Sequence, residues 1–290
     1  MNFMSIILDG LSLGAIYALI ALGYTMVYGI AKLLNFAHGD VIMVGAYAIL
    51  TTLNMGGNPI VSIVIAVVVC MVSGIVIERL AYRPLRGASP LAVLITAIGV
   101  SYFLQSIAQL VYGAKSQPVT LPSFGTIALG DTKISGGTVI TLIVGAIIMV
   151  GLTLFVKHTR TGRAMLAVSE DRGAAQLMGV NVNRIIMITF AIGSSLAAFA
   201  SLFYLMQIPS TSPTLGSMPG IKAFTAAVIG GIGSIPGAML GGVLLGLIEK
   251  ICLSIPAVSA YTTAIEFSLL ILILLIKPIG ILGKKRRVKV

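Results

Sequence analysis

The chain has 290 residues, of which 58% are hydrophobic and only 9% are charged. This composition excludes a soluble domain, because too little polar surface would remain to face water. The formal net charge of +11 does not indicate nucleic acid as a partner. The basic residues stand in short loops between apolar runs, which is the pattern of a protein embedded in membrane lipid.

Long charge-free tracts alternate with short polar loops along the chain. No charged residue occurs between Asp9 and Lys32 or between Asp40 and Glu78. A helix needs about 20 apolar residues to cross about 30 Å of hydrocarbon. The tracts therefore predict an all-α, polytopic transmembrane bundle in one domain, 1–290, with a re-entrant or broken helix near 220–254. The expected spans are 10–31, 36–54, 60–79, 91–112, 138–156, 185–207 and 261–277.

The hexapeptide N-F-A-H-G-D at 35–40 opens the second expected span. We expect its polar members, Asn35, His38 and Asp40, at the cytoplasmic face beside the translocation path. His38 and Asp40 could form a charge-sensing pair. Alternatively, Asn35 or Asp40 caps the helix and the histidine is interfacial. The residues alone leave both interpretations open.

The longest expected cytoplasmic loop, 157–184, carries signals for a short helix over residues 170–178. Ser169 is a suitable N-cap, Glu170 and Asp171 suit the first turn, and Gly179 suits the C-terminal stop. About nine residues are too few for a helix that is stable alone in water, so it needs a partner surface. The helix is either a connector that docks on its own chain or a coupling helix seated in a separate ATPase.

The run GGIGSIPG lies in the middle of the glycine-rich region. Glycine and proline break a helix there and expose backbone polar groups, which membrane depth tolerates only inside protein or beside a water-filled cavity. We interpret 220–237 as a re-entrant or broken helix that lines the path; the alternative is a kinked helix. The residues concerned are Gly230, Gly231, Gly233, Pro236 and Gly237.

Four charged residues fall inside apolar runs or at their rim: Lys222, Glu249, Lys250 and Glu266. Charges within a membrane are expensive and are often functional. We expect an interhelical ion pair between Lys222 and one of the glutamates, with a substrate ammonium or carboxylate contact as the alternative. The chain has no phosphate-cradling G-x4-G-K-[ST] loop and no nucleophile–base arrangement, so neither ATP binding nor an enzyme is predicted.

The basic residues set the expected orientation. With the N-terminus outside, 15 of the 19 Lys and Arg residues lie on the cytoplasmic side, which favours N-out and C-in. They are Lys32, Arg79, Arg83, Arg86, Lys157, Arg160, Arg163, Arg172, Arg184, Lys277, Lys284, Lys285, Arg286, Arg287 and Lys289.

Several motifs together resemble a known family. The run A-A-x3-G in the long loop resembles the cytoplasmic E-A-A-x3-G loop of bacterial ABC importer permeases, although Gly173 replaces the glutamate and the later L-P is missing. Branched-chain amino acid permeases share these departures. The stretch from Gly10 to Gly29, the hexapeptide and G-G-I-G-S-I-P-G at 230–237 also match that family, in particular the shorter of its two paired permeases. The loop residues that carry the match are Arg163, Glu170, Asp171, Arg172, Ala174, Ala175, Gly179 and Arg184.

The resemblance implies a permease subunit of an ATP-driven importer for leucine, isoleucine or valine in the bacterial inner membrane. Its implied partners are a second, related permease in a heterodimer, two cytoplasmic ATPases and an extracytoplasmic binding protein. ATP and magnesium would be held by the ATPases, and this chain would hold no cofactor. The resemblance also favours a gate at 35–40. Two alternatives remain: transport of urea, short amides or other small solutes, and an ion-coupled secondary transporter, which should show deep acidic residues.

Overall fold

The computed structural model describes residues 3–122, 124–129 and 132–283. Within these ranges the chain is a helical bundle with two short two-stranded ribbons. The long helices are α1 (Phe3–Ala31), α3 (Pro59–Ile77), α4 (Pro90–Tyr112), α5 (Gly136–His158), α8 (Val182–Gln207) and α10 (Ile235–Ser254). The shorter helices are α2 (His38–Asn54), α6 (Arg160–Glu170), α7 (Arg172–Leu177), α9 (Ser217–Gly230), α11 (Pro256–Ser259) and α12 (Thr262–Ile276). A π-helical turn, η1 (Glu78–Tyr82), continues α3.

The observed helices confirm the expected polytopic bundle. Six helical segments of the described chain are long and apolar enough to cross a membrane, with α3 and η1 counted as one. Their ends follow local chemistry: Asn58 and Ser89 accept a hydrogen bond from the first turn of α3 and α4, and each helix then begins with a proline.

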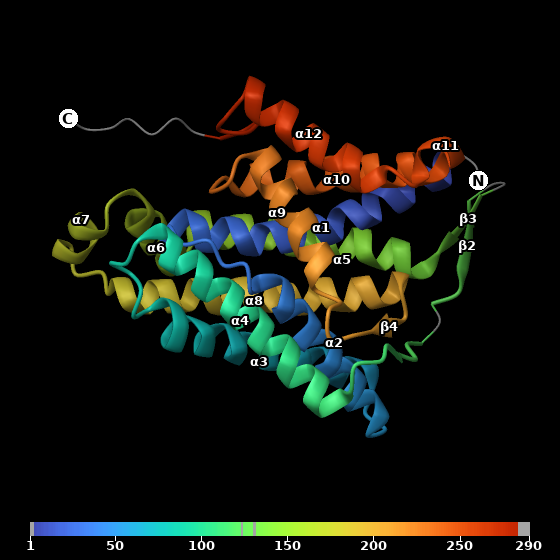
Figure 1. Cartoon of the computed structure of the whole chain (residues 1–290), viewed down its shortest axis with the longest axis horizontal. Coiled ribbons are helices and arrows are strands. Elements are labelled where there is room, and N and C mark those ends of the chain that lie inside the picture. The colour runs from blue at the N-terminus through green and yellow to red at the C-terminus, as the bar shows by residue number, and fades with distance from the viewer. Residues whose placement is uncertain (1–2, 123, 130–131, 284–290) are drawn as a thin grey trace.

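The bundle has two ends, which we name by what lies there. Figure 1 shows α1 running along the long axis, with the N-terminus near the two ribbons and α7 at the opposite end. We call these the ribbon end and the coupling end. The basic residues counted for orientation lie at or near the coupling end, in the ends of the helices and the loops there, except for the five from Lys284 onward, which lie outside the described residues.

The ribbons are small. Strand β1 (Gln117–Pro118) pairs antiparallel with β4 (Ser210–Thr211), and β2 (Thr126–Leu129) pairs antiparallel with β3 (Thr132–Ser135). The first ribbon joins the segment after α4 to the segment after α8, so it ties two distant parts of the chain together at the ribbon end.

Helix α1 is the centre of the bundle, and 72% of its most apolar stretch is buried. It lies between α10 and α8 (Figure 1). Glycines make the α1–α10 contact close: a Cβ at Gly242 would overlap Ala18, and one at Gly246 would overlap the backbone of Gly14. Small residues four apart allow such an approach of two helices. By contrast, only 17% of the corresponding stretch of α4 is buried.

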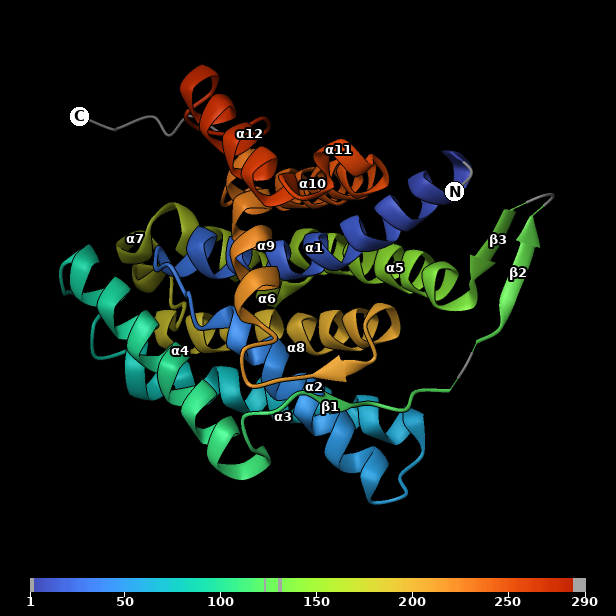
Figure 2. The same cartoon turned by 45° about the vertical axis from the view of Figure 1, so that its right-hand side comes forward.

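Two helices begin part-way through the bundle. After α1 ends, residues 32–37 return inward and α2 starts beside Gly23, eight residues before the end of α1. At about 1.5 Å per residue this is some 12 Å inside the coupling end. Helix α9 starts in contact with the first turn of α2, because Gly216 and Gly220 lie against Gly39. Figure 2 shows α9 crossing α1 at a steep angle.

The glycine-rich region forms a helical hairpin, so the alternative of a single kinked helix is wrong. Helices α9 and α10 pack antiparallel, with Gly230 against Gly237 and Ala226 against Gly241. The turn between them, 231–234, lies at the coupling end next to Gly29. The expected break at membrane depth is therefore found at the start of α9, while the glycine turn itself stands at the end of the bundle.

Candidate functional site

The segment between α5 and α8 differs in detail from the predicted helix at 170–178. Helix α6 ends at Glu170, and Asp171 separates it from the six-residue α7. Glu170 therefore closes one helix instead of opening the next. Ser169 lies inside α6 and is not the N-cap of α7, and its hydroxyl donates to the Leu166 carbonyl 2.7 Å away. The cap of α7 is Asp171, whose carboxylate accepts from the Ala174 N–H at 3.0 Å.

Helix α7 presents an apolar tip. Leu177 is 90% exposed and Met178 84% exposed, whereas Ala175 is 4% exposed and packs into the core of its own chain. Gly179 has a φ of +84°, so it stops the helix as its position suggested. Arg163, Glu170, Ala174 and Arg184 are exposed. Ala174, Leu177 and Met178 of α7 are thus available to a partner, whereas Ala175 is not.

Two arginines join the coupling segment to the membrane helices. Arg172 donates to the Ala31 carbonyl at the end of α1, and Arg86 contacts both Glu78 of η1 and Asn183 at the start of α8. Burial, followed by the charge of Arg86, lowers the pKa of Arg172. Both side chains line a cavity of about 530 Å³ between the coupling segment and the loop that leads into α4. Arg172 therefore links α7 directly to the end of α1, and Arg86 links the loop before α4 to η1 and α8.

The hexapeptide lies inside the bundle, which corrects its expected place at the face. Lys32 turns the chain inward with a φ of +55°, which non-glycine residues adopt uncommonly. The His38 ring packs edge-on against Tyr24 with 4.9 Å between ring centroids, and it occupies the space that a side chain at Gly23 would need. Neither Asn35 nor Asp40 caps α2: its N-cap is Ala37, with no side-chain bond. The Asn35 side chain instead accepts from the Tyr82 hydroxyl at 2.8 Å.

Asp40 belongs to a polar network that joins three helices. It is 2% exposed, and its Oδ1 accepts from Gln105 Nε2 of α4 at 2.8 Å. The same nitrogen lies 3.3 Å from Ser217 Oγ at the start of α9. His38 and Asp40 face different neighbours, so the structure does not bring them together as a pair.

The glycines at 230–237, which were predicted to line the path, form or flank the turn of the α9–α10 hairpin. The Gly230 carbonyl accepts from the Leu282 N–H at 2.9 Å, so the turn after α12 satisfies the end of α9. Gly231 and Gly233 have φ values of +108° and +95°, which favour glycine. Pro236 stands in the first turn of α10, where its missing N–H costs nothing. In the described chain their neighbours are other parts of the same chain.

Lys222 is paired with both glutamates. Its Nζ lies 2.7 Å from Glu249 Oε1 and 3.2 Å from Glu266 Oε2, and the Tyr17 hydroxyl donates to Glu249 at 2.7 Å. The cluster therefore links α1, α9, α10 and α12. Lys222 is 8% exposed, so it is neutralised inside the bundle and does not extend to water.

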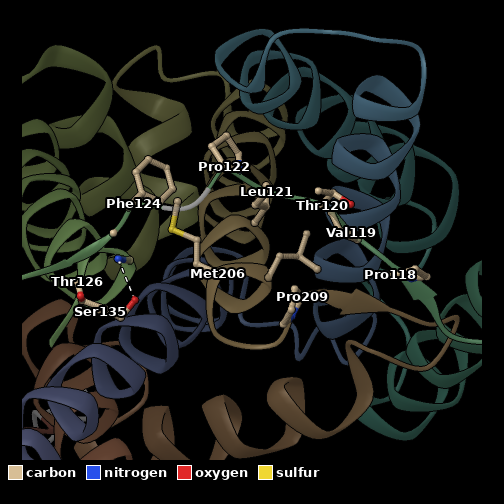
Figure 3. Close-up of a pocket in the computed structure, with 13 residues that line it drawn as sticks. Pro118, Val119, Thr120, Leu121, Pro122, Phe124, Thr126, Ser135, Met206 and Pro209 are labelled. Atoms are coloured by element: carbon tan, nitrogen blue, oxygen red, sulfur yellow. Dashed lines mark hydrogen bonds between the residues drawn. The ribbon is translucent and has the colours of Figure 1, made fainter. Parts of the chain in front are cut away.

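The ribbon end carries a larger cavity of about 670 Å³, shown in Figure 3. Its wall is formed by residues 118–122 and 124–126, by Ser135 and Gly137, and by Leu205, Met206 and Pro209 at and after the end of α8. Apolar side chains dominate this wall, and it lies far along the chain from the hexapeptide and the coupling segment. Short irregular segments leave no periodic signal in a sequence, so this cavity could not be predicted.

The predicted residues thus fall into four groups: the coupling segment, the crossing of α1, α2 and α9, the turn of the α9–α10 hairpin, and the Lys222 cluster. Gln105, Arg86 and Tyr17 complete three of these groups and were not predicted as site residues. Gln105 could have been found from the sequence, because polar residues recur four apart along one side of the otherwise apolar α4. Tyr17 gives no such signal, because a tyrosine in an apolar helix is ordinary.

The chain is similar over its whole length to known transport permeases. The family described as "branched-chain amino acid transport system / permease component" matches residues 6–275. The permease BraD of Pseudomonas aeruginosa is 44% identical, covering 100% of this chain and 98% of BraD. LivH of Escherichia coli K12 is 42% identical over 99% of this chain and 98% of its own length. Both are named high-affinity branched-chain amino acid transport system permease proteins.

Two solved structures share the fold at low identity. PsaBC from Streptococcus pneumoniae aligns with a TM-score of 0.52 at 18% identity, covering 96% of this chain and 93% of that chain. An inward-facing structure described as a metal-chelate type ABC transporter aligns with a TM-score of 0.54 at 17% identity, covering 94% and 85%.

Proposed function

The chain belongs to the family of branched-chain amino acid transport permeases, and we propose that it forms one half of an importer path for leucine, isoleucine and valine. It is a multi-pass ABC permease of the bacterial inner membrane. The observation that carries the substrate class is identity of 42–44% over essentially the whole length of two relatives named for branched-chain amino acids.

The other half of the path is a second, related permease. Helices α3, α4 and α5 bury only 17–28% of their most apolar stretches, so they have free faces for lipid and for a partner. A heterodimer leaves the path between the two chains, where the half-length helices α2 and α9 meet. In this arrangement Asn35, His38 and Asp40 belong to a gate beside the path.

ATP is bound outside this chain, by two cytoplasmic ATPases that dock on α6 and α7. The exposed apolar tip at Leu177 and Met178 supports this proposal, because water does not favour such a surface on a short polar segment. Arg172 and Arg86 then transmit movement of the docked helix to α1 and to the loop before α4. The chain itself has a transport role and no catalytic one.

An extracytoplasmic binding protein delivers the substrate at the ribbon end. The cavity of Figure 3 offers that protein an apolar recess beside the end of α8. Specificity then depends on both proteins, which is why the family resemblance alone left urea and short amides as alternatives.

Reconstitution tests the proposal directly. The permease pair, its ATPases and the binding protein are placed in proteoliposomes with ATP inside, and uptake of labelled leucine, isoleucine and valine is measured. We expect uptake that needs ATP and every subunit. Uptake of urea or acetamide in place of these amino acids would show that the substrate is a different small solute, while the family stays the same. Uphill uptake by this chain alone would instead identify a secondary transporter.

A further inference from the structure

One flank of α4 is polar along the half nearer the ribbon end. Ser101, Gln105 and Gln109 are four residues apart, and Tyr102 and Ser106 form an adjacent row. Tyr102, Ser106 and Gln109 are exposed on the isolated chain. The exposed residues of the opposite flank, Phe103, Ile107, Leu110 and Val111, are apolar. Lipid suits the apolar flank, whereas the polar flank indicates contact with water, solute or protein.

Gln105 is the residue of this flank that the bundle orients. Its Nε2 lies within hydrogen-bond distance of Asp40 Oδ1, at 2.8 Å, and of Ser217 Oγ, at 3.3 Å. A carboxylate only accepts hydrogen bonds, so the amide nitrogen must be the atom that faces Asp40. In the described chain all hydrogen bonds of the Gln105 side chain use this nitrogen, so its carbonyl oxygen remains available as an acceptor.

The Asp40 carboxylate places a negative charge next to the Gln105 amide. No basic side chain of the described chain lies within 4 Å of the Asp40 carboxylate, although the residue is 2% exposed. A buried carboxylate without a cation is costly, and hydrogen bonds from neutral groups offset that cost only in part. The network is therefore suited to a ligand that brings a positive charge.

An apolar surface adjoins the network on α9. Met218 directly follows Ser217, Ile221 stands one turn later, and the two are 47% and 44% exposed. Figure 2 shows α9 and α4 on the same face of the molecule. The polar acceptor and the aliphatic surface thus lie together where a solute between two permeases would pass.

We propose that Gln105, held by Asp40 and Ser217, receives the ammonium group of the substrate during passage, while Met218 and Ile221 contact its aliphatic side chain. This inference rests on the proposed function and names the contacts of its path. Binding of the ammonium group requires the negative charge of Asp40. Positioning of Gln105 does not, because a neutral residue of the same shape would still accept its hydrogen bond. A purely structural tie between α2 and α4 would require only the hydrogen bond.

Asp40→Asn separates the two roles. Its amide oxygen can accept from Gln105 as the carboxylate does, but the charge is gone. In proteoliposomes with saturating loaded binding protein, we expect leucine uptake per complex to fall about tenfold or more, the scale of a charge-assisted hydrogen bond. The yield of folded complex should remain, because the hydrogen bond from Gln105 is kept. The double variant Asp40→Asn with Gln105→Glu returns one carboxylate to the pair and should recover uptake.

Two further variants complete the test. Gln105→Met keeps the length of the side chain but removes the acceptor, so it should show the same loss of leucine uptake. It is the variant to rely on if Asp40→Asn lowers the yield of folded complex. Tyr112→Phe is the matched control, because it removes the 2.7 Å bond to Thr51 that ties the far end of α4 without changing charge. It should transport normally.

Uptake at the wild-type rate in Asp40→Asn or in Gln105→Met would overturn the inference. So would an uptake defect in Asp40→Asn that the double variant leaves unchanged. These results would leave the proposed function intact, provided that the wild-type complex imports leucine. Failure of the wild type to import leucine, isoleucine or valine would reject the proposed function itself.

Discussion

At the residue scale, Lys222 balances charges that the bundle could not otherwise bury. It shares its ammonium group between Glu249 and Glu266, and Glu266 is only 1% exposed. Removing one partner of a buried ion pair typically costs about 3–5 kcal/mol, because the other charge is left uncompensated. Four helices meet at this cluster. Losing the ion pair should therefore weaken the packing of the α9–α10 hairpin against α1 and α12.

Lys222→Met should therefore lower the stability of the permease by several kcal/mol, on the order of the cost of breaking a buried pair. Thermal unfolding of the purified permease pair in detergent measures it. Lys222→Met combined with Glu266→Gln and Glu249→Gln leaves no charge behind and should regain most of the loss. Lys250→Met is the control, since Lys250 neighbours Glu249 in sequence but lies in no ion pair of the described chain. Equal stability of Lys222→Met and the control would show that the cluster is not a structural link.

At the element scale, the α1–α10 contact depends on the absence of side chains at particular glycines. A Cβ at Gly246 would overlap backbone atoms of Gly14, and backbone cannot move aside as the end of a flexible side chain can. Gly151 on α5 has no atom within 4 Å of the corresponding position. Both glycines are helical, so they differ in packing and not in conformation.

Gly246→Ala should separate α1 from α10 and reduce the amount of folded permease in the membrane. Gly151→Ala should be neutral or slightly stabilising, by up to about 1 kcal/mol, because alanine is the better helix former. Fluorescence-detected size-exclusion chromatography of tagged variants compares the two. A normal elution profile for Gly246→Ala would contradict the close contact of these helices.

The coupling segment is the second element whose role can be tested alone. Leu177 is 90% exposed and touches little of its own chain, whereas Ala175 is buried. Leu177→Asp should leave the permease folded but remove an apolar contact from the ATPase interface, where such residues contribute about 1–2 kcal/mol or more. We expect ATPase copurification and substrate-stimulated hydrolysis to fall.

Ala175→Glu provides the contrast, because it places a charge in the core of this chain and should reduce folded permease itself. If Leu177→Asp retains its ATPases at the wild-type level, α7 is a connector and the coupling assignment is wrong.

At the scale of the whole molecule, the sequence predicted what depends on apolar length and breakers. Five of the seven expected spans match helices long enough to cross a membrane, and the hairpin at the glycine turn follows from its breakers. The expected spans at 36–54 and 261–277 correspond to the shorter helices α2 and α12, while α10 is long enough to cross. The depth of the hexapeptide did not follow, because a polar sequence at a helix start looks the same at a membrane face and inside a bundle. Only the contacts of His38 with Tyr24 and Gly23 place it.

Long-range contacts explain the other differences. The coupling loop divides at Asp171, which caps α7, and Ala175 one turn later packs into the core. Local capping signals do not contain this tertiary contact. Gln105 is recognisable as part of the site only once α2, α4 and α9 converge. Periodicity within one helix cannot report which other helix lies beside it.

The orientation of the molecule is the last prediction, and it rests on the bias of basic residues toward the coupling end. Short loops rich in Lys and Arg remain in the cytoplasm, so the ribbon end should face outward. Cys70 and Cys252 are buried and can be replaced to give a cysteine-free background.

In that background, Lys115→Cys after α4 and Met178→Cys after α7 place single thiols at opposite ends; both native residues are exposed. An impermeant maleimide should label position 115 in intact cells. It should label position 178 only after the membrane is opened, in cells without the ATPases that would cover it. If position 178 is labelled in intact cells and position 115 is protected, the topology is the opposite of the predicted one. In that case α7 lies outside the cell, where no cytoplasmic ATPase can reach it.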